Sequence, residues 1–127
     1  MTPRFVQTVP VLRIFDATKA REFYLAFLGF KVDFEHRFAP DLPLYMQVSM
    51  GELVLTLSEH HGDASPGARI IVEMTGLADF QSALLAKRYG YARPGLVQEE
   101  WGATTMTIAD PFYNRLTFTE RDAATTT

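Results

Sequence analysis

The sequence predicts an α+β fold made of two successive βαβββ halves, each with one helix and several strands. Three observations predict it. The apolar residues change between helical and strand spacing several times along the chain. Each amphipathic helical stretch ends at a glycine that an aromatic residue follows, in Leu28-Gly29-Phe30 and in Tyr89-Gly90-Tyr91. The two glycines lie roughly 60 residues apart, so the halves have similar lengths.

The pairing of the halves has a physical reason, because one βαβββ unit cannot cover both faces of its own sheet. Two such units are therefore expected to pack as a pair. Two copies are few for a repeat, so the alternative at this point is a pair of unrelated amphipathic helices in one α+β domain.

The first half begins with a predicted strand from Phe5 to Ile14 that is rich in β-branched and aliphatic residues. Pro10 interrupts it, since proline has no N–H to donate, and this places the strand at an edge or at a bend. Asp16 is the predicted cap of a helix over Ala17 to Leu28, and Gly29 ends that helix. Three strands are then predicted at residues 30–37, 44–49 and 53–58.

The second half follows a predicted linker from Glu59 to Ala68, which is rich in glycine and small residues. A strand at residues 69–74 leads to a helix over Leu77 to Tyr89, and Gly90 is its predicted end. Three more strands are predicted at residues 96–98, 104–109 and 115–120. We expect a single domain over residues 1–121, with repeats at about 5–59 and 68–120, and a disordered polar tail at residues 122–127.

Composition excludes several classes of function. The chain has 127 residues and no cysteine, which excludes disulfides, thiolate metal sites and cysteine nucleophiles. Its net charge of −3 argues against a nucleic acid partner, because phosphate contacts need a basic face. The sequence has neither an apolar run as long as a membrane span nor the layout of a signal peptide, so we expect no membrane partner and a cytoplasmic location.

Two motifs resemble those of a known family. Val9-Pro10-Val11-Leu12, followed by the run from Phe23 to Phe30, resembles the opening of the vicinal oxygen chelate superfamily, which includes glyoxalases, extradiol dioxygenases and bleomycin-resistance proteins. Glu99-Glu100-Trp101-Gly102, followed by the run from Asp110 to Leu116, resembles its closing signature. The similarity spans about residues 5–120 and is greatest to the bleomycin-resistance type. It implies a glyoxalase-like fold, in which mixed sheets form a U-shaped cup with both helices outside.

One residue departs from the family pattern. Tyr113 stands where the family has a glycine, in a turn that favours positive φ. A tyrosine with that backbone costs on the order of 1 kcal/mol, so either the turn carries this strain or it has rearranged.

The resemblance implies four metal-binding strand positions, which fall on Val9, Thr56, Arg69 and Thr117. None is a good ligand for a divalent metal, and an arginine repels a cation. Gln7, which shares the strand parity of Val9, is the only other candidate on the first strand. The neighbouring His60 and His61 are expected to lie in a polar loop. We therefore expect no metal, no other cofactor and no catalytic residue.

Without a metal, the resemblance implies a protein that sequesters a small molecule. Bleomycin-resistance proteins are arm-exchanged homodimers that hold the drug in clefts at the subunit interface. Here Pro10 is the predicted hinge of the arm, and the partner is a second copy of the chain. The expected ligand is planar or cationic and bleomycin-like, since the net charge of the dimer is negative. The residues expected to bind it are Phe38, Trp101, Tyr45, Glu35 and Glu99.

Other interpretations remain open from the sequence. Phe38, Tyr45 and Trp101 are also typical of packing residues, and the acidic rim of Asp33, Glu35, Glu99 and Glu100 is also typical of a solvated face. The chief alternative function is a metal-dependent glyoxalase-like lyase or dioxygenase with atypical ligands. A third is a scaffold whose cup has lost its ligand.

Overall fold

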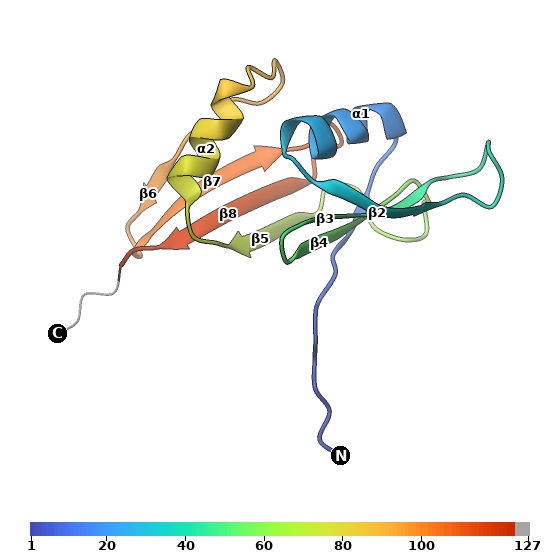
Figure 1. Cartoon of the computed structure of the whole chain (residues 1–127), viewed down its shortest axis with the longest axis horizontal. Coiled ribbons are helices and arrows are strands. Elements are labelled where there is room, and N and C mark those ends of the chain that lie inside the picture. Colours follow the sequence, from blue (N-terminus) through green and yellow to red (C-terminus); the bar gives the residue numbers. More distant parts are fainter. Residues whose placement is uncertain (124–127) are drawn as a thin grey trace. The chain divides into compact units, whose positions relative to one another are not determined.

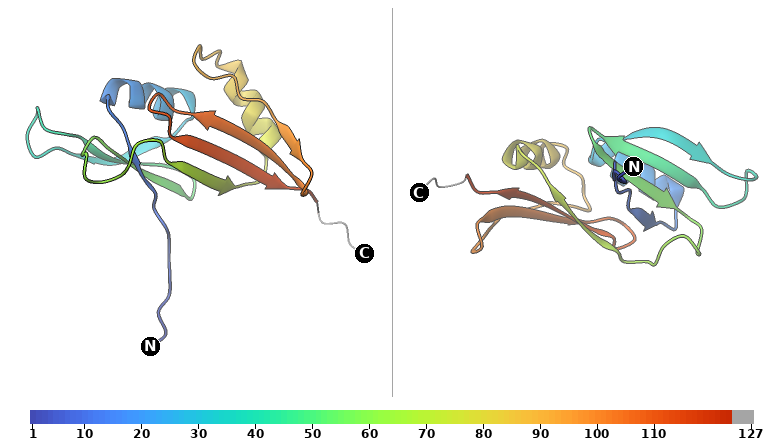
Figure 2. Two further views of the ribbon diagram at one scale, coloured as in Figure 1. Left: turned by 180° about the vertical axis from the view of Figure 1, so that it is seen from behind. Right: turned by 90° about the horizontal axis from the view of Figure 1, so that it is seen from below.

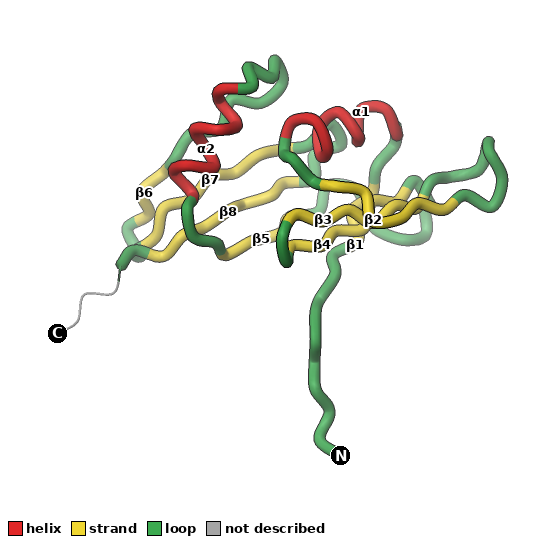
Figure 3. Tube along the Cα trace, in the orientation of Figure 1, coloured by secondary structure: helices red, strands yellow, loops and turns green. Residues whose placement is uncertain are grey.

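The chain forms two compact units that each carry one βαβββ repeat. The computed structural model describes residues 1–123, and its first unit is Met1–Pro66, while the second begins at Gly67. The division falls inside the predicted linker. Each unit has a four-stranded mixed sheet and one helical region (Figures 1 and 3). The predicted α+β fold of two tandem repeats is thus confirmed, whereas their union into one domain over residues 1–121 stays a prediction.

The first unit has its strands in the order β1-β4-β3-β2, with β1 parallel to β4 and the other pairs antiparallel. One face of this sheet carries buried apolar side chains, such as Leu12 and Leu57. Its elements are β1 (Val11–Arg13), α1 (Ala17–Arg21), the π-helix η1 (Glu22–Phe27), β2 (Lys31–His36), β3 (Tyr45–Met50) and β4 (Leu53–Ser58).

The first strand is much shorter than predicted. Residues 1–9 form an exposed arm that runs away from β1 (Figure 1), and Phe5 is 93% exposed. Pairing with β4 begins where the Thr56 backbone N–H donates to the Pro10 carbonyl at 2.9 Å. Apolar composition alone does not make a strand, because a strand also needs a hydrogen-bonding partner along its edge.

The first helix begins as predicted and ends in a wider turn. The Asp16 side chain accepts a hydrogen bond from the Lys19 backbone N–H at 2.9 Å, as an N-cap does. From Glu22 the helix is a π-helix, in which the Leu28 N–H donates to the Phe23 carbonyl at 2.9 Å. Gly29, with φ of +97°, ends it as predicted. The predicted apolar face is buried: Ala20, Phe23, Tyr24, Phe27 and Leu28.

The second unit repeats this topology, with the strand order β5-β8-β7-β6 and β5 parallel to β8. Its helix lies on one face of the sheet (Figure 2), where the Phe80 ring meets the Phe118 ring edge-on at 5.3 Å. Within residues 1–123, none of the helices combines the length and apolar character that a bilayer crossing needs. The elements of this unit are β5 (Arg69–Glu73), α2 (Leu77–Ala86), β6 (Val97–Glu99), β7 (Ala103–Ala109) and β8 (Arg115–Arg121).

The second helix ends earlier than predicted. It stops at Ala86, and the left-handed residue after it is Arg88, with φ of +52°, rather than Gly90. The Lys87 and Arg88 N–H groups donate to the carbonyls of Leu84 and Leu85, which tightens the last turn. The predicted tail falls partly outside the described residues; Asp122, which lies within them, accepts a hydrogen bond from Gln98 Nε2 at 2.9 Å.

The turn before β8 keeps the left-handed backbone. Tyr113 has φ of +64°, so the turn carries the strain of about 1 kcal/mol instead of rearranging. The buried Asp110 carboxylate holds it by accepting from the Phe112 N–H at 2.9 Å and from the Asn114 N–H at 2.7 Å. Asn114 Nδ2 also donates to Asp110, at 2.8 Å. This network fixes where β8 begins.

The start of α2 is capped from the sheet. Gly76, its N-cap residue, has no side chain to accept a hydrogen bond. Glu120 of β8 instead accepts from the backbone N–H groups of Gly76 at 3.2 Å and Leu77 at 3.0 Å. This carboxylate therefore both satisfies the helix end and joins the helix to the sheet.

Glu120→Ala is expected to lower the free energy of unfolding by about 1 kcal/mol, because two helix N–H groups lose their acceptor. Urea unfolding followed by circular dichroism measures it. Glu100→Ala, in the exposed turn between β6 and β7, is the control and should unfold like the wild type. Equal stability of the two variants would contradict the capping role.

Strand β2 has a bulge between Val32 and Phe34, and Asp33 is the extra residue in it. Its carboxylate accepts hydrogen bonds from Gln47 Nε2 at 3.1 Å and Ser49 Oγ at 2.9 Å, and these lower the pKa of Asp33 below its ordinary value of 3.8. The Lys31 ammonium, at 4.0 Å, adds to this.

The lowered pKa of Asp33 predicts a pH dependence of stability. The ionised carboxylate stabilises the fold above about pH 4, and the contribution disappears as the pH falls through its folded-state pKa. Asp33→Asn should therefore be less stable than the wild type at pH 7, and the gap in urea midpoint should narrow at pH 3. Asp41→Asn, in the loop before β3, is the control. A gap that is the same at both pH values would rule the effect out.

Candidate functional site

The sheet of the second unit has one face that α2 does not cover. Side chains alternate between the faces of a strand, so the neighbours of the helix-facing Phe118 on β8 point the other way. We call this second side the open face. Its members on β5, β7 and β8 are Arg69, Ile71, Glu73, Ala103, Thr105, Thr107, Ala109, Arg115, Thr117, Thr119 and Arg121.

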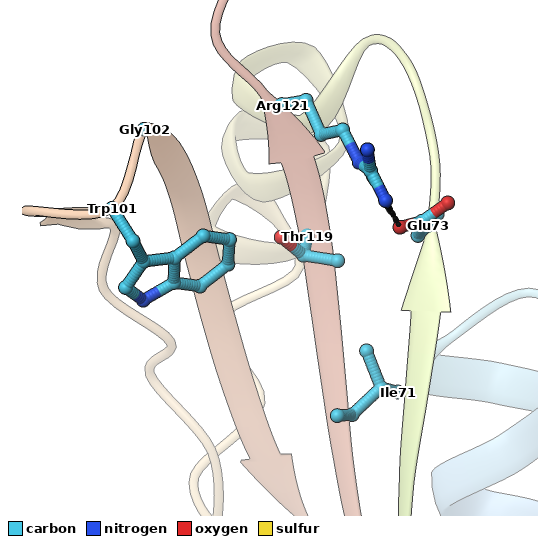
Figure 4. A pocket seen from close by; sticks show the side chains of 6 residues that line it. All are labelled: Ile71, Glu73, Trp101, Gly102, Thr119 and Arg121. Atoms are coloured by element: carbon cyan, nitrogen blue, oxygen red, sulfur yellow. Dashed lines mark hydrogen bonds and ion pairs between the residues drawn. The ribbon is translucent and has the colours of Figure 1, made fainter.

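A hollow of about 340 Å³ lies on the open face (Figure 4). Its walls are apolar on two sides: the Trp101 indole, 69% exposed, stands on the turn between β6 and β7, and Ile71, 63% exposed, stands on β5. Thr119 of β8 lies between them. Glu73, Gly102 and Arg121 complete the lining. The volume is in the range of small-molecule sites.

Two kinds of polar group line the hollow. Arg121 donates from Nη2 at 2.8 Å and from Nε at 3.2 Å to one oxygen of Glu73 (Figure 4), so these two charges neutralise each other. Thr119 is only 5% exposed, and its hydroxyl has no hydrogen-bond partner among the described residues. In Figure 4 that hydroxyl points toward the side of Trp101. A buried unpaired hydroxyl costs about 1–3 kcal/mol, which a ligand with a matching polar atom recovers.

Of the two predicted ligand-binding residues in the second unit, Trp101 lines the hollow and Glu99 does not. Glu99, at the end of β6, accepts a hydrogen bond from the Thr105 hydroxyl at 2.9 Å. Thr105 pairs in register with Thr119 across β7 and β8. The carboxylate belongs to β6, two strands from the Thr119 hydroxyl of β8, and reaches the open face through Thr105 of the intervening strand β7.

The other predicted ligand-binding residues lie in the first unit. Tyr45 stacks on Phe34, with ring centroids 6.4 Å apart. Phe38 follows β2, is 76% exposed and meets His36 edge-on at 4.6 Å.

Glu35 lies on a different face from Tyr45. It pairs with the buried Met46 and accepts a hydrogen bond from Arg21 of α1 at 2.9 Å, so it lies on the helix side of the sheet. The bulge at Asp33 explains this, because one extra residue moves every later side chain of β2 to the opposite face.

The four positions where the family resemblance implies metal ligands do not fit a divalent metal. Thr117 shares a hydrogen bond of 2.9 Å with Thr107, and Thr56 is buried beside β1. Val9 lies on the exposed arm, and Arg69 brings a positive charge. These side chains offer neither a carboxylate nor an imidazole.

The remaining candidate ligands do not supply such a set either. Gln7 points its amide at the Glu52 carbonyl, 3.4 Å away. Across residues 1–123, no three His, Cys, Asp or Glu side chains converge on one point. We therefore derive no chemistry through a metal.

Sequence reasoning missed Gly102 and four lining residues on strands β5 and β8: Ile71, Glu73, Thr119 and Arg121. A signal for them was present. Arg69 and Thr117 had been placed on the inner side of the cup, and residues two and four further along each strand share that side. The missing information was which strands pair and in what register.

Comparison with known proteins agrees with this topology. Several solved structures share the fold, among them the following three. A bleomycin resistance determinant encoded on the transposon Tn5 has 22% identity and a TM-score of 0.73, over 94% of this chain and 100% of that one. A bleomycin-binding protein complexed with bleomycin has 21% identity and a TM-score of 0.68, over 93% and 100%. TnmS3, an antibiotic binding protein from Streptomyces sp. CB03234, has 18% identity and a TM-score of 0.69, over 96% and 99%.

These identities establish the fold alone, and no protein with a curated function matches the chain in sequence. The family is decided by a sequence profile described as glyoxalase superfamily protein, which matches residues 2–125. This confirms the resemblance to vicinal oxygen chelate proteins. Because the match spans nearly the whole sequence, the chain belongs to the glyoxalase superfamily.

Proposed function

We propose that this protein binds and sequesters a planar or cationic small molecule of the bleomycin kind, without transforming it, in clefts at the interface of a homodimer. One observation carries the proposal: the exposed Trp101 indole and Ile71 flank a hollow whose buried Thr119 hydroxyl lacks a partner. Exposed aromatic surface beside an unsatisfied buried polar atom is a feature of binding sites.

The physical basis of recognition is stacking plus one hydrogen bond. A flat heteroaromatic ring lying on the Trp101 indole gains about 0.5–1.5 kcal/mol beyond the burial of its area. A ring nitrogen or amide of the same ligand pairs with the Thr119 hydroxyl. The Glu99 carboxylate, held by Thr105 on the neighbouring strand β7, favours a positive group near the ring. Two structural relatives are described as binding bleomycin or an antibiotic, which supports this class of ligand.

The homodimer is supported by apolar surface that one chain leaves uncovered. The arm of residues 1–9 carries Phe5 and Val6, which are 93% and 83% exposed. Pro10, at the base of the arm, restricts its direction. We propose that this arm is exchanged with a second copy, and that Tyr45 and Phe38 of the first unit supply further walls to the clefts.

Bleomycin titration tests the ligand. Trp101 is the only tryptophan, so intrinsic fluorescence reports directly on the hollow. We expect a saturable fluorescence change, and calorimetry should give a Kd about 2- to 10-fold weaker for Trp101→Ala. Tyr91→Ala, an exposed aromatic residue beyond α2, is the matched control and should bind like the wild type.

An unchanged fluorescence signal together with no heat of binding would contradict bleomycin as the ligand.

Metal analysis of the purified protein, after exposure to Ni²⁺, Zn²⁺, Mn²⁺ and Fe²⁺, tests the enzymatic alternative. One tightly held metal ion per chain would overturn sequestration in favour of a metal-dependent lyase or dioxygenase.

Sedimentation of the full chain tests the homodimer. We expect twice the mass of one chain, and the double substitution Phe5→Glu with Val6→Glu should shift the equilibrium to monomer, because charges cannot be buried in the partner. Thr2→Glu, on the same arm, is the control and should stay dimeric. A monomeric wild type at tens of micromolar would refute the interface.

A further inference from the structure

Two arginines stand side by side at the end of the open face away from Trp101. Arg69 opens β5 and Arg115 opens β8, and the two are partners in the parallel register of these strands. Both belong to the face that carries Ile71 and Thr117. Paired residues on neighbouring strands are about 5 Å apart at their Cα atoms, so the two cationic side chains share one region of the surface.

Neither arginine has a carboxylate partner in the described part of the chain. The four ion pairs found there involve Arg21, Lys31, Arg37 and Arg121. The Arg115 Nε is buried without a hydrogen-bond partner, and the guanidinium lies 5.1 Å from the centre of the Tyr113 ring. The carboxylates close in sequence are engaged elsewhere: Asp110 holds the turn, Glu120 caps α2 and Glu73 pairs with Arg121.

This arrangement is electrostatically unfavourable as it stands. Like charges directly opposite each other on paired strands destabilise a sheet. At the other end of the same face, Glu73 neutralises Arg121. The positive charge at the Arg69 end is therefore uncompensated, and a buried N–H donor is unused there.

We propose that Arg69 and Arg115 form a binding site for an oxyanion, a carboxylate or a phosphate group. Guanidinium groups present forked N–H donors that match the oxygens of such anions, and two of them supply the charge. The Tyr113 ring holds the Arg115 fork in place from one side. A polyanion such as nucleic acid is excluded by the small size of the pair and the net charge of −3.

The position of this site also describes the ligand, and this step rests on the proposed function. Arg115 and Thr119 lie four positions apart along β8, or about 13 Å. A single ligand that reaches both ends has a planar ring between Trp101 and Ile71 and an anionic group about 13 Å from the Thr119 hydroxyl. With a positive group toward Glu99, it is zwitterionic.

The oxyanion site is tested with simple probes that need no planar ligand. Sodium phosphate and sodium acetate are titrated against sodium chloride at matched ionic strength, while the Nε–Hε signal of Arg115 is followed by ¹⁵N NMR and Tm by calorimetry. We expect a saturable shift of that signal and a rise in Tm above that in chloride. The more effective anion identifies phosphate or carboxylate as the preferred group.

The variants Arg69→Gln and Arg115→Gln should each weaken anion binding about 10-fold, since each removes charge-assisted hydrogen bonds. Arg93→Gln, an exposed arginine of the same unit, is the matched control. If Arg115→Gln does not fold, the Arg69→Gln variant, which changes an exposed side chain, provides the test.

A Tm response in Arg69→Gln equal to that of the wild type, or no response to either anion in the wild type, would overturn the site. Failure of bleomycin binding with an intact anion response would refute the proposed ligand and leave the oxyanion site standing.

Discussion

Each unit of this protein must cover a four-stranded sheet that has two faces, and it has one helix to do so. In the second unit, α2 covers the face of Phe118. The residues on either side of Phe118 in the strand, Thr117 and Thr119, must then point to the opposite face. They are small and polar, which suits a surface that no element of the unit packs against. The hollow beside Trp101 therefore exists because one helix covers only one of the two faces of the sheet, and no separate binding element is needed.

Strand β8 takes part in the core, the open face and the cap of α2. Asp110 and Asn114 fix its beginning through a buried hydrogen-bonded turn, and Glu120 near its end caps α2. Between them the strand alternates core and open-face residues. A shift of one residue would therefore exchange Phe118 for Thr119 in the core and lose the cap at the same time. The strain at Tyr113 is tolerated because the turn sets this register.

The sequence predicted elements best where local chemistry decides them. The strand Leu53–Ser58 and the Asp16 cap were predicted as found, because an apolar run and a capping carboxylate act within a few residues. The arm around Phe5 was predicted wrongly, since strand formation depends on a distant partner. The face of Glu35 depends on the bulge at Asp33, which no local pattern revealed. Trp101, which lines the hollow, stands in a motif that the sequence shows directly, whereas Ile71 and Thr119 needed the register of β5 and β8.

Charge shows why local geometry changes a conclusion drawn from composition. The net charge of −3 favours a cationic ligand at a distance. Within a binding site, however, charges farther away than about 8–10 Å are screened by salt, so the groups that touch the ligand decide its orientation. On the open face these are the neutral pair of Glu73 with Arg121, the carboxylate of Glu99 and two unpaired arginines. The net charge of the protein therefore influences how a ligand approaches it from a distance. The arrangement of charged groups along β8 favours a bound ligand whose two ends carry opposite charges.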